Sequence, residues 1–169
     1  ESAFLQENID VFAWQPSDIL GVPREVIEHH LVVYPNARPF KHKVSKQVLE
    51  RQEFIAQEIP KLDAVGLVTG VLHPTWLAKP WLFARQNGKW RLCIDSTDIN
   101  KAFLKDPFPL PQIDQIVDCT ASCDLLSFLD AYSSYHQIFM GKEDEEKMAF
   151  GTPCGKYYFV CMPFELKSV

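Results

Sequence analysis

Residues 125–138, LLSFLDAYSSYHQI, are the most informative stretch of this chain. An apolar run ends in one acidic residue, Asp130, and a polar turn then leads into a second apolar stretch. We expect residues 125–130 to form a buried strand with Asp130 at its mouth. An isolated Asp after a strand usually only opens a turn, but a carboxylate there also suits a divalent cation that must meet phosphate.

The composition favours one globular domain whose charge is distributed unevenly. Hydrophobic residues make up 47% of the 169 residues, enough for a core. The net charge of −5 supplies no global basic field and counts mildly against a nucleic-acid binder. Locally, residues 38–51 carry five basic side chains against one acid, whereas residues 143–146 are all acidic and are expected in a solvated turn. The basic residues are Arg38, Lys41, Lys43, Lys46 and Arg51.

The cysteines and the ends of the chain bear on its location. Five cysteines without framework spacing fit a reducing compartment, and Cys119 and Cys123 are expected to be small buried residues. No charged leader with an apolar core opens the chain, and no apolar run approaches eighteen residues, so we expect neither secretion nor membrane insertion. Both ends resemble cuts in a longer protein.

Periodicity and turn residues predict the elements of the first hundred residues. Residues 30–34, HLVVY, are expected to form a strand. A helix is expected from a cap at Ser45, to be kinked or shortened by Pro60 and closed by Gly66. Asn87-Gly88 between two apolar runs, residues 81–86 and 89–95, predicts a hairpin with a tight primed turn.

The second part of the chain is expected to continue the mixture of short helices and hairpins. The Pro-rich residues 105–111 predict an extended connection that cannot be a central strand. A short helix should follow over residues 112–120, and residues 148–164 predict a second hairpin that turns near Cys154-Gly155. The expected fold class is therefore α+β.

Several blocks in order along the chain resemble the reverse transcriptases of gypsy-type LTR retrotransposons of plants. Residues 126–138 match the usual block, LSFLDAYSGYHQI, at every position except Ser134, which replaces a Gly at a position that we expect to favour positive φ. Three further blocks are similar to family sequences: NGKWRLCIDSTDINKA at 87–102, KDPFPLPQIDQIVDCTAS at 105–122, and KEDEEKMAFGTPCGKYYFVCMPF at 142–164.

The resemblance implies a division of the chain into parts of a right-hand polymerase. Residues 1–44 would be an extended segment that leads into the polymerase, residues 45–124 the fingers, and residues 125–169 the first part of the palm. The fold would be α+β, with antiparallel hairpins and short helices.

The resemblance also implies roles for individual residues. Asp130 would be the catalytic metal ligand for Mg²⁺, and Ala131 would offer a backbone contact to the incoming nucleotide. Arg91 would bind the triphosphate, and Tyr135 would be the aromatic residue that blocks a ribose 2′-hydroxyl. Further contacts would come from Arg85 to the nucleotide, and from Lys89, Lys101 and Lys105 to nucleic acid. Without the resemblance, Tyr135 is a packed aromatic, and Arg91 and the lysines are solvated side chains.

Four departures from the family pattern would weaken this site. Ser96 replaces a usual Phe and removes a large packing group. Ala84 and Gln86 stand where lysines are common. Glu165 replaces a Gly and puts negative charge where phosphate should lie.

The family activity is RNA-directed DNA polymerisation, a nucleotidyl transfer that uses two metal ions. The second catalytic block of the family, Tyr-x-Asp-Asp, lies beyond residue 169, so we expect this chain alone not to polymerise, and whether it is itself an enzyme stays open. One alternative is a non-catalytic retroelement remnant that binds nucleic acid or protein through residues 38–51 and the hairpin. Another is a fragment without function.

The implied partners are an RNA or DNA template-primer, dNTPs and the rest of the polymerase (palm, thumb and RNase H). No membrane partner is expected, and the implied location is intracellular, in a cytoplasmic particle or the nucleus.

Overall fold

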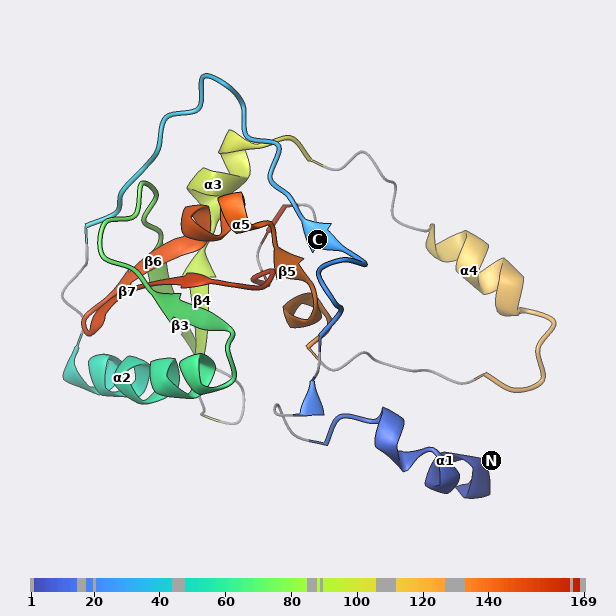
Figure 1. The fold of residues 1–169 in the computed structure, drawn as a ribbon. Coiled ribbons are helices and arrows are strands. Elements are labelled where there is room, and N and C mark those ends of the chain that lie inside the picture. The colour runs from blue at the N-terminus through green and yellow to red at the C-terminus, as the bar shows by residue number, and fades with distance from the viewer. Residues whose placement is uncertain are drawn as a thin grey trace.

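The computed structural model describes residues 2–14, 18–19, 21–43, 48–84, 88, 90–105, 112–126, 133–164 and 166–167. In this part of the chain, helices are interspersed with three small β-sheets (Figure 1). The α-helices are α1 (Ser2–Glu7), α2 (Leu49–Ala64), α3 (Thr97–Ala102), α4 (Ile113–Thr120) and α5 (Lys142–Glu145), and the 3-10 helices are η1 (Ile9–Val11), η3 (Ser134–Gln137) and η4 (Glu146–Met148). The strands are β1 (Glu28–His29), β2 (Val68–Gly70), β3 (Lys79–Ala84), β4 (Trp90–Asp95), β5 (Phe139–Met140), β6 (Ala149–Thr152) and β7 (Gly155–Phe159). Among the described residues, no helix is both long and apolar enough to cross a lipid bilayer.

The hairpin predicted around residues 87–88 is present as β3 and β4. The two strands pair antiparallel from Lys79↔Asp95 to Ala84↔Trp90. A two-residue turn at residues 87–88 would pair residue 86 with residue 89, and therefore residue 84 with residue 91. The observed register instead pairs Ala84 with Trp90, so it differs by one residue from the register of the predicted turn. Gly88 has a φ of +74°, as a turn glycine can, but Asn87 lies outside the described residues.

The second predicted hairpin is present as β6 and β7, and it is shorter than the sequence suggested. Its last pair is Thr152↔Gly155, so the turn lies at Pro153-Cys154. The Thr152 hydroxyl donates to the Gly155 carbonyl at 2.9 Å and accepts from the Cys154 amide at 3.2 Å. Strand β2 pairs with the outer side of β7 and completes a three-stranded sheet.

Helix α2 confirms the predicted helix and its end, but Pro60 does not shorten it. The helix continues through Pro60 to Ala64. Both Pro60 and Ala56 are exposed, so water can bond the Ala56 carbonyl, which the ring leaves without a helical donor. At the end, Gly66 has a φ of +71°, its amide donates to the Asp63 carbonyl, and the Leu67 amide donates to the Leu62 carbonyl. This is the hydrogen-bond pattern of a Schellman motif. The predicted cap, Ser45, lies outside the described residues.

One hydrophobic core joins α2 to the sheets. Ile55 and Ile59 point from α2 into it, and Phe150 and Phe159 contribute from β6 and β7. The rings of Phe150 and Phe159 lie 5.3 Å apart, centroid to centroid. Phe103, which follows α3, is only 1% exposed. Residues from the N-terminal half and from the C-terminal half therefore share the same core.

The predicted strand over residues 30–34 is wrong. The only strand in this region is β1, which pairs parallel with β5. Beyond it, the backbone bonds to several different elements: the Leu31 amide donates to Asp144 Oδ2, the Leu104 amide donates to the Val32 carbonyl, and Val33 forms an isolated bridge with Phe103. No single neighbouring strand receives these bonds, so residues 30–34 do not form a strand although the run is apolar.

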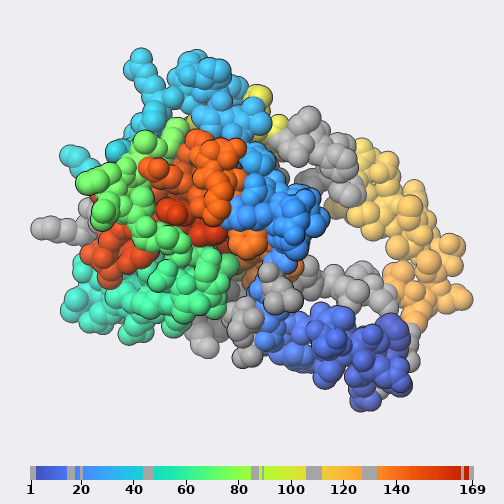
Figure 2. All heavy atoms as spheres, in the orientation of Figure 1, coloured from blue at the N-terminus to red at the C-terminus, as the bar shows by residue number. Residues whose placement is uncertain are grey.

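The region around α4 also differs from expectation. Helix α4 confirms the predicted helix over residues 112–120, but it has no buried residue and projects away from the core (Figures 1 and 2). Cys119 and Cys123 are therefore exposed, not buried. Leu125 and Leu126 are 70% and 45% exposed and belong to no strand, so the start of the predicted buried strand is wrong. Its remainder, and residues 106–111 of the Pro-rich link, lie outside the described residues.

The acidic run at 143–146 is not a solvated turn. It forms α5 and the start of η4, and Asp144 and Glu145 are 2% and 5% exposed. Glu145 Oε1 accepts a hydrogen bond from Arg24 Nη2 at 2.6 Å and lies 3.1 Å from Lys142 Nζ. Asp144 binds Lys147 through Oδ1. Burial of these carboxylates is possible because each has a cationic partner.

Arg24 connects the N-terminal segment to this acidic helix. Its guanidinium also bonds Glu28 Oε1 at 2.7 Å and the Met140 carbonyl at 2.8 Å, and it lies over the Phe139 ring at 4.6 Å. Partial burial opposes the charge of Arg24, but its bonds to Glu28 and Glu145 raise its pKa.

We expect Arg24→Ala to lower the free energy of unfolding by about 2 kcal/mol, because Glu145 loses a charged hydrogen-bond donor while it stays buried. Urea denaturation monitored by circular dichroism measures this change. The control is Lys61→Ala, which breaks the exposed pair between Lys61 and Glu58 and should cost no more than about 0.5 kcal/mol. Equal losses for the two variants would contradict a central role for Arg24.

Candidate functional site

A cleft of about 330 Å³ lies between strand β4 and the 3-10 helix η3. One wall comes from β4 and the other from the chain that follows residue 132, and the aromatic residues Phe159 and Phe164 also line the cleft. The lining residues are Leu62, Arg91, Leu92, Cys93, Ile94, Ser133, Ser134, Tyr135, His136, Phe159, Pro163 and Phe164. Such a concave site with mostly apolar walls and a few polar groups is typical of a small-molecule pocket.

Phe164 contacts one residue from each of the two walls of this cleft. The guanidinium carbon of Arg91 lies 5.3 Å from the centre of the Phe164 ring. The Tyr135 ring meets the same Phe164 ring edge-on, at 5.5 Å between centroids and an interplanar angle of 74°. Arg91 and Tyr135, to which the resemblance assigns the triphosphate and the sugar, therefore both contact the same aromatic ring.

A tight turn sets the position of Tyr135. Ser133 has left-handed backbone angles, φ 47° and ψ 44°, and its carbonyl accepts from the His136 amide at 2.9 Å. Ser134 is already part of η3, so the expectation that position 134 needs a positive φ is wrong; that conformation falls one residue earlier. A non-glycine residue in the left-handed region costs about 1 kcal/mol, which η3 must offset.

His136 is a cleft residue that the sequence did not identify. Its ring stacks on Phe159 with 6.4 Å between centroids. Burial lowers the pKa of His136, and the nearby charge of Arg91 lowers it further. The imidazole is therefore held in its neutral form beside a permanent cation.

The other predicted site residues are not brought to the cleft or lie outside the described residues. Lys101 is exposed on α3, where its Nζ lies 3.4 Å from Asp98 Oδ1, and Lys105 is exposed after α3. Neither residue lines the cleft. Asp130, Ala131, Arg85 and Lys89 lie outside the described residues, as do Gln86 and Glu165. Asp130 precedes Ser133, the first described residue of the cleft wall, by three positions in the sequence.

Ser96, one of the departures from the family pattern, is buried at the end of β4. The space beside it is a cavity of only about 20 Å³, lined by Ile94, Ile99 and Met148 among others. This volume holds about one water molecule. Neighbouring side chains therefore fill most of the space that a larger residue would occupy.

The comparisons with known proteins agree on one family. The family described as "Reverse transcriptase (RNA-dependent DNA polymerase)" matches residues 78–168, more than half of the chain. The chain is 33% identical over 135 residues to the Pol polyprotein of transposon 297 of Drosophila melanogaster, and 31% identical over 141 residues to that of transposon gypsy of the same species. Each alignment covers 80% of this chain but only 12% or 13% of the relative, so the chain spans about an eighth of these relatives.

Two solved structures resemble the chain in fold. A prototype foamy virus protease–reverse transcriptase aligns with a TM-score of 0.77 over 98% of this chain and 22% of its own, at 15% sequence identity. A foamy viral protease–reverse transcriptase in complex with double-stranded DNA aligns with a TM-score of 0.61 over 82% of this chain and 23% of its own, at 14% identity. These likenesses confirm the expected α+β fold of a polymerase fragment.

We expect His136 to make the stability of the protein depend on pH. The folded chain holds the pKa of His136 below the unfolded value of 6.5, so the unfolded state takes up the proton first as the pH falls. The stabilising contribution of His136 to the free energy of unfolding is therefore complete above about pH 7 and decreases below about pH 6.5. Urea denaturation at a series of pH values measures this decrease. In His136→Gln the free energy of unfolding should fall less at acidic pH than in the wild type, whereas the exposed control His73→Gln should show the same fall as the wild type. Identical profiles for wild type and His136→Gln would contradict the assignment.

Proposed function

Since the chain belongs to the reverse transcriptase (RNA-dependent DNA polymerase) family and is similar to the polyproteins of LTR retrotransposons, we propose that it forms the fingers and the first part of the palm of a gypsy-type reverse transcriptase of plant lineage. The parent enzyme adds dNTPs to a primer on an RNA template. Residues 45–124 are the proposed fingers, and residues 125–169 are the proposed start of the palm.

The observation that carries this proposal is the meeting of Arg91 and Tyr135 in one cleft. They come from two separate sequence blocks and are 44 positions apart in the chain, yet they lie against the same ring of Phe164. A guanidinium can give paired hydrogen bonds to phosphate and keeps its charge. A tyrosine ring beside it can exclude a 2′-hydroxyl by bulk. The cleft thus offers one partner for each end of a deoxynucleoside triphosphate.

The same proposal assigns further contacts to other residues that the resemblance singles out. Arg85 supports the triphosphate, and the Ala131 backbone contacts the nucleotide. Lys89, Lys101 and Lys105 contact the template-primer through its phosphates. For Lys101, nucleic acid must compete with Asp98. The foamy viral neighbour was solved with double-stranded DNA, which supports nucleic acid as the partner class.

Mg²⁺ is the proposed cofactor, and Asp130 is its proposed ligand. Among the described residues that line the cleft there is one cation, Arg91, and no carboxylate. The oxygen donors that Mg²⁺ prefers must therefore come from other residues, beginning with Asp130. When bound, the metal neutralises phosphate charge and activates the attacking oxygen. This chain's own cleft residues bind and orient the nucleotide.

The remaining proposals concern partners and location. The rest of the palm, the thumb and an RNase H segment would complete the polymerase. The protein would act inside the cell, in a cytoplasmic particle or the nucleus.

Primer extension on an RNA template tests the proposed activity. We expect the 169-residue chain alone to add no nucleotide, and the longer polyprotein segment that contains it to do so. Asp130→Asn should lower extension by the longer segment at least about a hundredfold, because a charge that stabilises the transition state is lost. Asp118→Asn on the exposed helix α4 is the matched control and should have no effect.

Two outcomes of this experiment, and one that adds an RNA-binding measurement, would contradict parts of the proposal. Extension by the isolated chain that Asp130→Asn abolishes would show that the chain is complete for catalysis. Extension by the longer segment that is insensitive to Asp130→Asn would remove Asp130 from the site. If the longer segment is inactive and the chain still binds single-stranded RNA in a salt-dependent manner, the chain is a binding remnant.

Kinetics of the longer segment also test the geometry of the cleft. Phe164→Ala should raise the KM for dNTP about tenfold, because it removes a cation–π contact and an aromatic pair that hold Arg91 and Tyr135. Phe4→Ala, at a similarly exposed position on α1, should leave the KM unchanged. An unchanged KM for Phe164→Ala would show that Phe164 does not position these two residues.

A further inference from the structure

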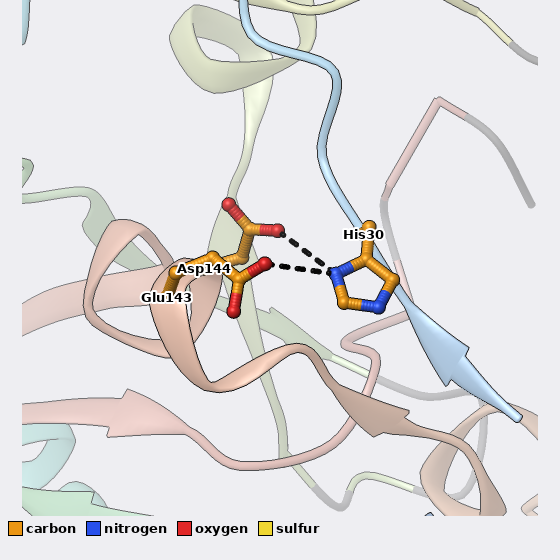
Figure 3. Close-up of side chains that lie close together, drawn as sticks. All are labelled: His30, Glu143 and Asp144. Carbon is orange, nitrogen blue, oxygen red and sulfur yellow. Dashed lines mark ion pairs between the residues drawn. The ribbon is translucent and has the colours of Figure 1, made fainter.

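Three potential metal ligands meet at the junction of the N-terminal segment and α5. They are His30, which follows β1, and the consecutive residues Glu143 and Asp144 of α5, more than a hundred positions away (Figure 3). His30 Nδ1 lies 3.2 Å from Glu143 Oε1 and 3.8 Å from Asp144 Oδ2. One donor atom from each residue lies within 4.8 Å of the others. None of the three lines the cleft.

From this arrangement we propose that His30, Glu143 and Asp144 form a binding site for a divalent 3d metal ion of the Zn²⁺ type. Zn²⁺ binds His nitrogen and carboxylate oxygen at about 2.0–2.2 Å, so two of its ligands in tetrahedral geometry lie about 3.3–3.6 Å apart. The two contacts of His30 Nδ1 bracket this spacing. The fourth position is left to solvent, because Glu143 and His30 are 70% and 53% exposed in their side chains.

The residues around the three ligands are placed as the partners of metal ligands commonly are. Histidine ligands of metals commonly direct their second nitrogen at a carboxylate, and His30 Nε2 lies 3.6 Å from Glu28 Oε2. Ligating carboxylates are commonly held by hydrogen bonds, and Asp144 Oδ2 accepts from the Leu31 amide at 2.9 Å. The ammonium of Lys147 binds the other oxygen of Asp144, so Oδ2 keeps a lone pair for the metal.

Gly141 provides the space for the imidazole. A Cβ on residue 141 would collide with His30 Nδ1, the proposed ligand atom. The backbone of Gly141 has a φ of −55°, which any residue can adopt. Gly141→Ala should therefore displace the ring of His30 without straining the main chain.

The donor set separates this site from the proposed Mg²⁺ site. Mg²⁺ prefers oxygen ligands and octahedral geometry, and it retains water, so an imidazole nitrogen disfavours it. A bound Zn²⁺ would cross-link the N-terminal segment to α5 and raise the stability of the fold by mass action. This inference is independent of the proposed polymerase activity, since no catalytic residue takes part in it.

Titration of the purified 169-residue chain with ZnCl2 tests the site, with a chelating dye as competitor and the melting temperature as a second readout. We expect saturable binding of Zn²⁺ and a rise in melting temperature that MgCl2 at the same concentration does not give. His30→Gln, Glu143→Gln and Gly141→Ala should each weaken Zn²⁺ binding by about tenfold or more. Glu143 is mostly solvent-exposed, so its variant should remain folded.

Matched controls separate this site from other exposed histidine and carboxylate side chains. His73→Gln and Glu53→Gln change exposed residues outside the cluster and should bind Zn²⁺ as the wild type does. In NMR spectra, the imidazole signals of His30 should shift as Zn²⁺ is added. Absence of Zn²⁺ binding, or binding that none of the three variants weakens, would overturn the proposal and leave the cluster as an ion-pair contact alone.

Discussion

The buried carboxylate of Glu145 and its partner Arg24 constrain much of the structure. A buried carboxylate is costly unless a cation and hydrogen bonds compensate it, so residue 24 must lie against α5. This contact holds β1 beside β5, a pair of two residues that is too short to persist alone. It also keeps the preceding residues in place, where the Val22 amide donates to the Gln137 carbonyl at 2.7 Å. Gln137 ends η3, so the wall of the cleft that carries Tyr135 depends on contacts made by the N-terminal segment.

The parts of the fold that could be predicted from the sequence are those that local chemistry decides. The two hairpins follow from turn residues between apolar runs. The end of α2 follows from Gly66, because glycine readily adopts the positive φ that this helix end requires. The apolar run at 30–34 could not be interpreted in this way, because its hydrogen-bond partners come from residues 103, 104 and 144. Burial of Asp144 and Glu145 could not be predicted for the same reason, since Glu145 pairs with Arg24 and Asp144 accepts from the Leu31 amide, both far away in the sequence.

The residues of the candidate site also fall into those that the local sequence identifies and those that only contacts between distant residues identify. Arg91 and Tyr135 could be named from sequence blocks, because each block has a recognisable order of residues. Phe164 and His136 could not, since their roles are contacts: the Phe164 ring contacts both Arg91 and Tyr135, and the neutral imidazole of His136 stacks on Phe159. Residue type alone cannot show which surface an aromatic side chain covers.

The net charge of −5 is a poor guide to what this protein binds. Two of the four acids in the run at 143–146 are buried against Arg24, Lys142 and Lys147, and among the described residues none of that run lines the cleft. Charges in water are screened beyond about 8 Å at physiological ionic strength, so a ligand responds to the charges near its own site. At the cleft the described charge is the guanidinium of Arg91, beside a histidine whose lowered pKa keeps it neutral. An acidic protein can therefore present a cationic cleft, which is our proposed nucleotide site, and, at the separate junction of His30 with α5, an anionic cluster, which is our proposed metal site.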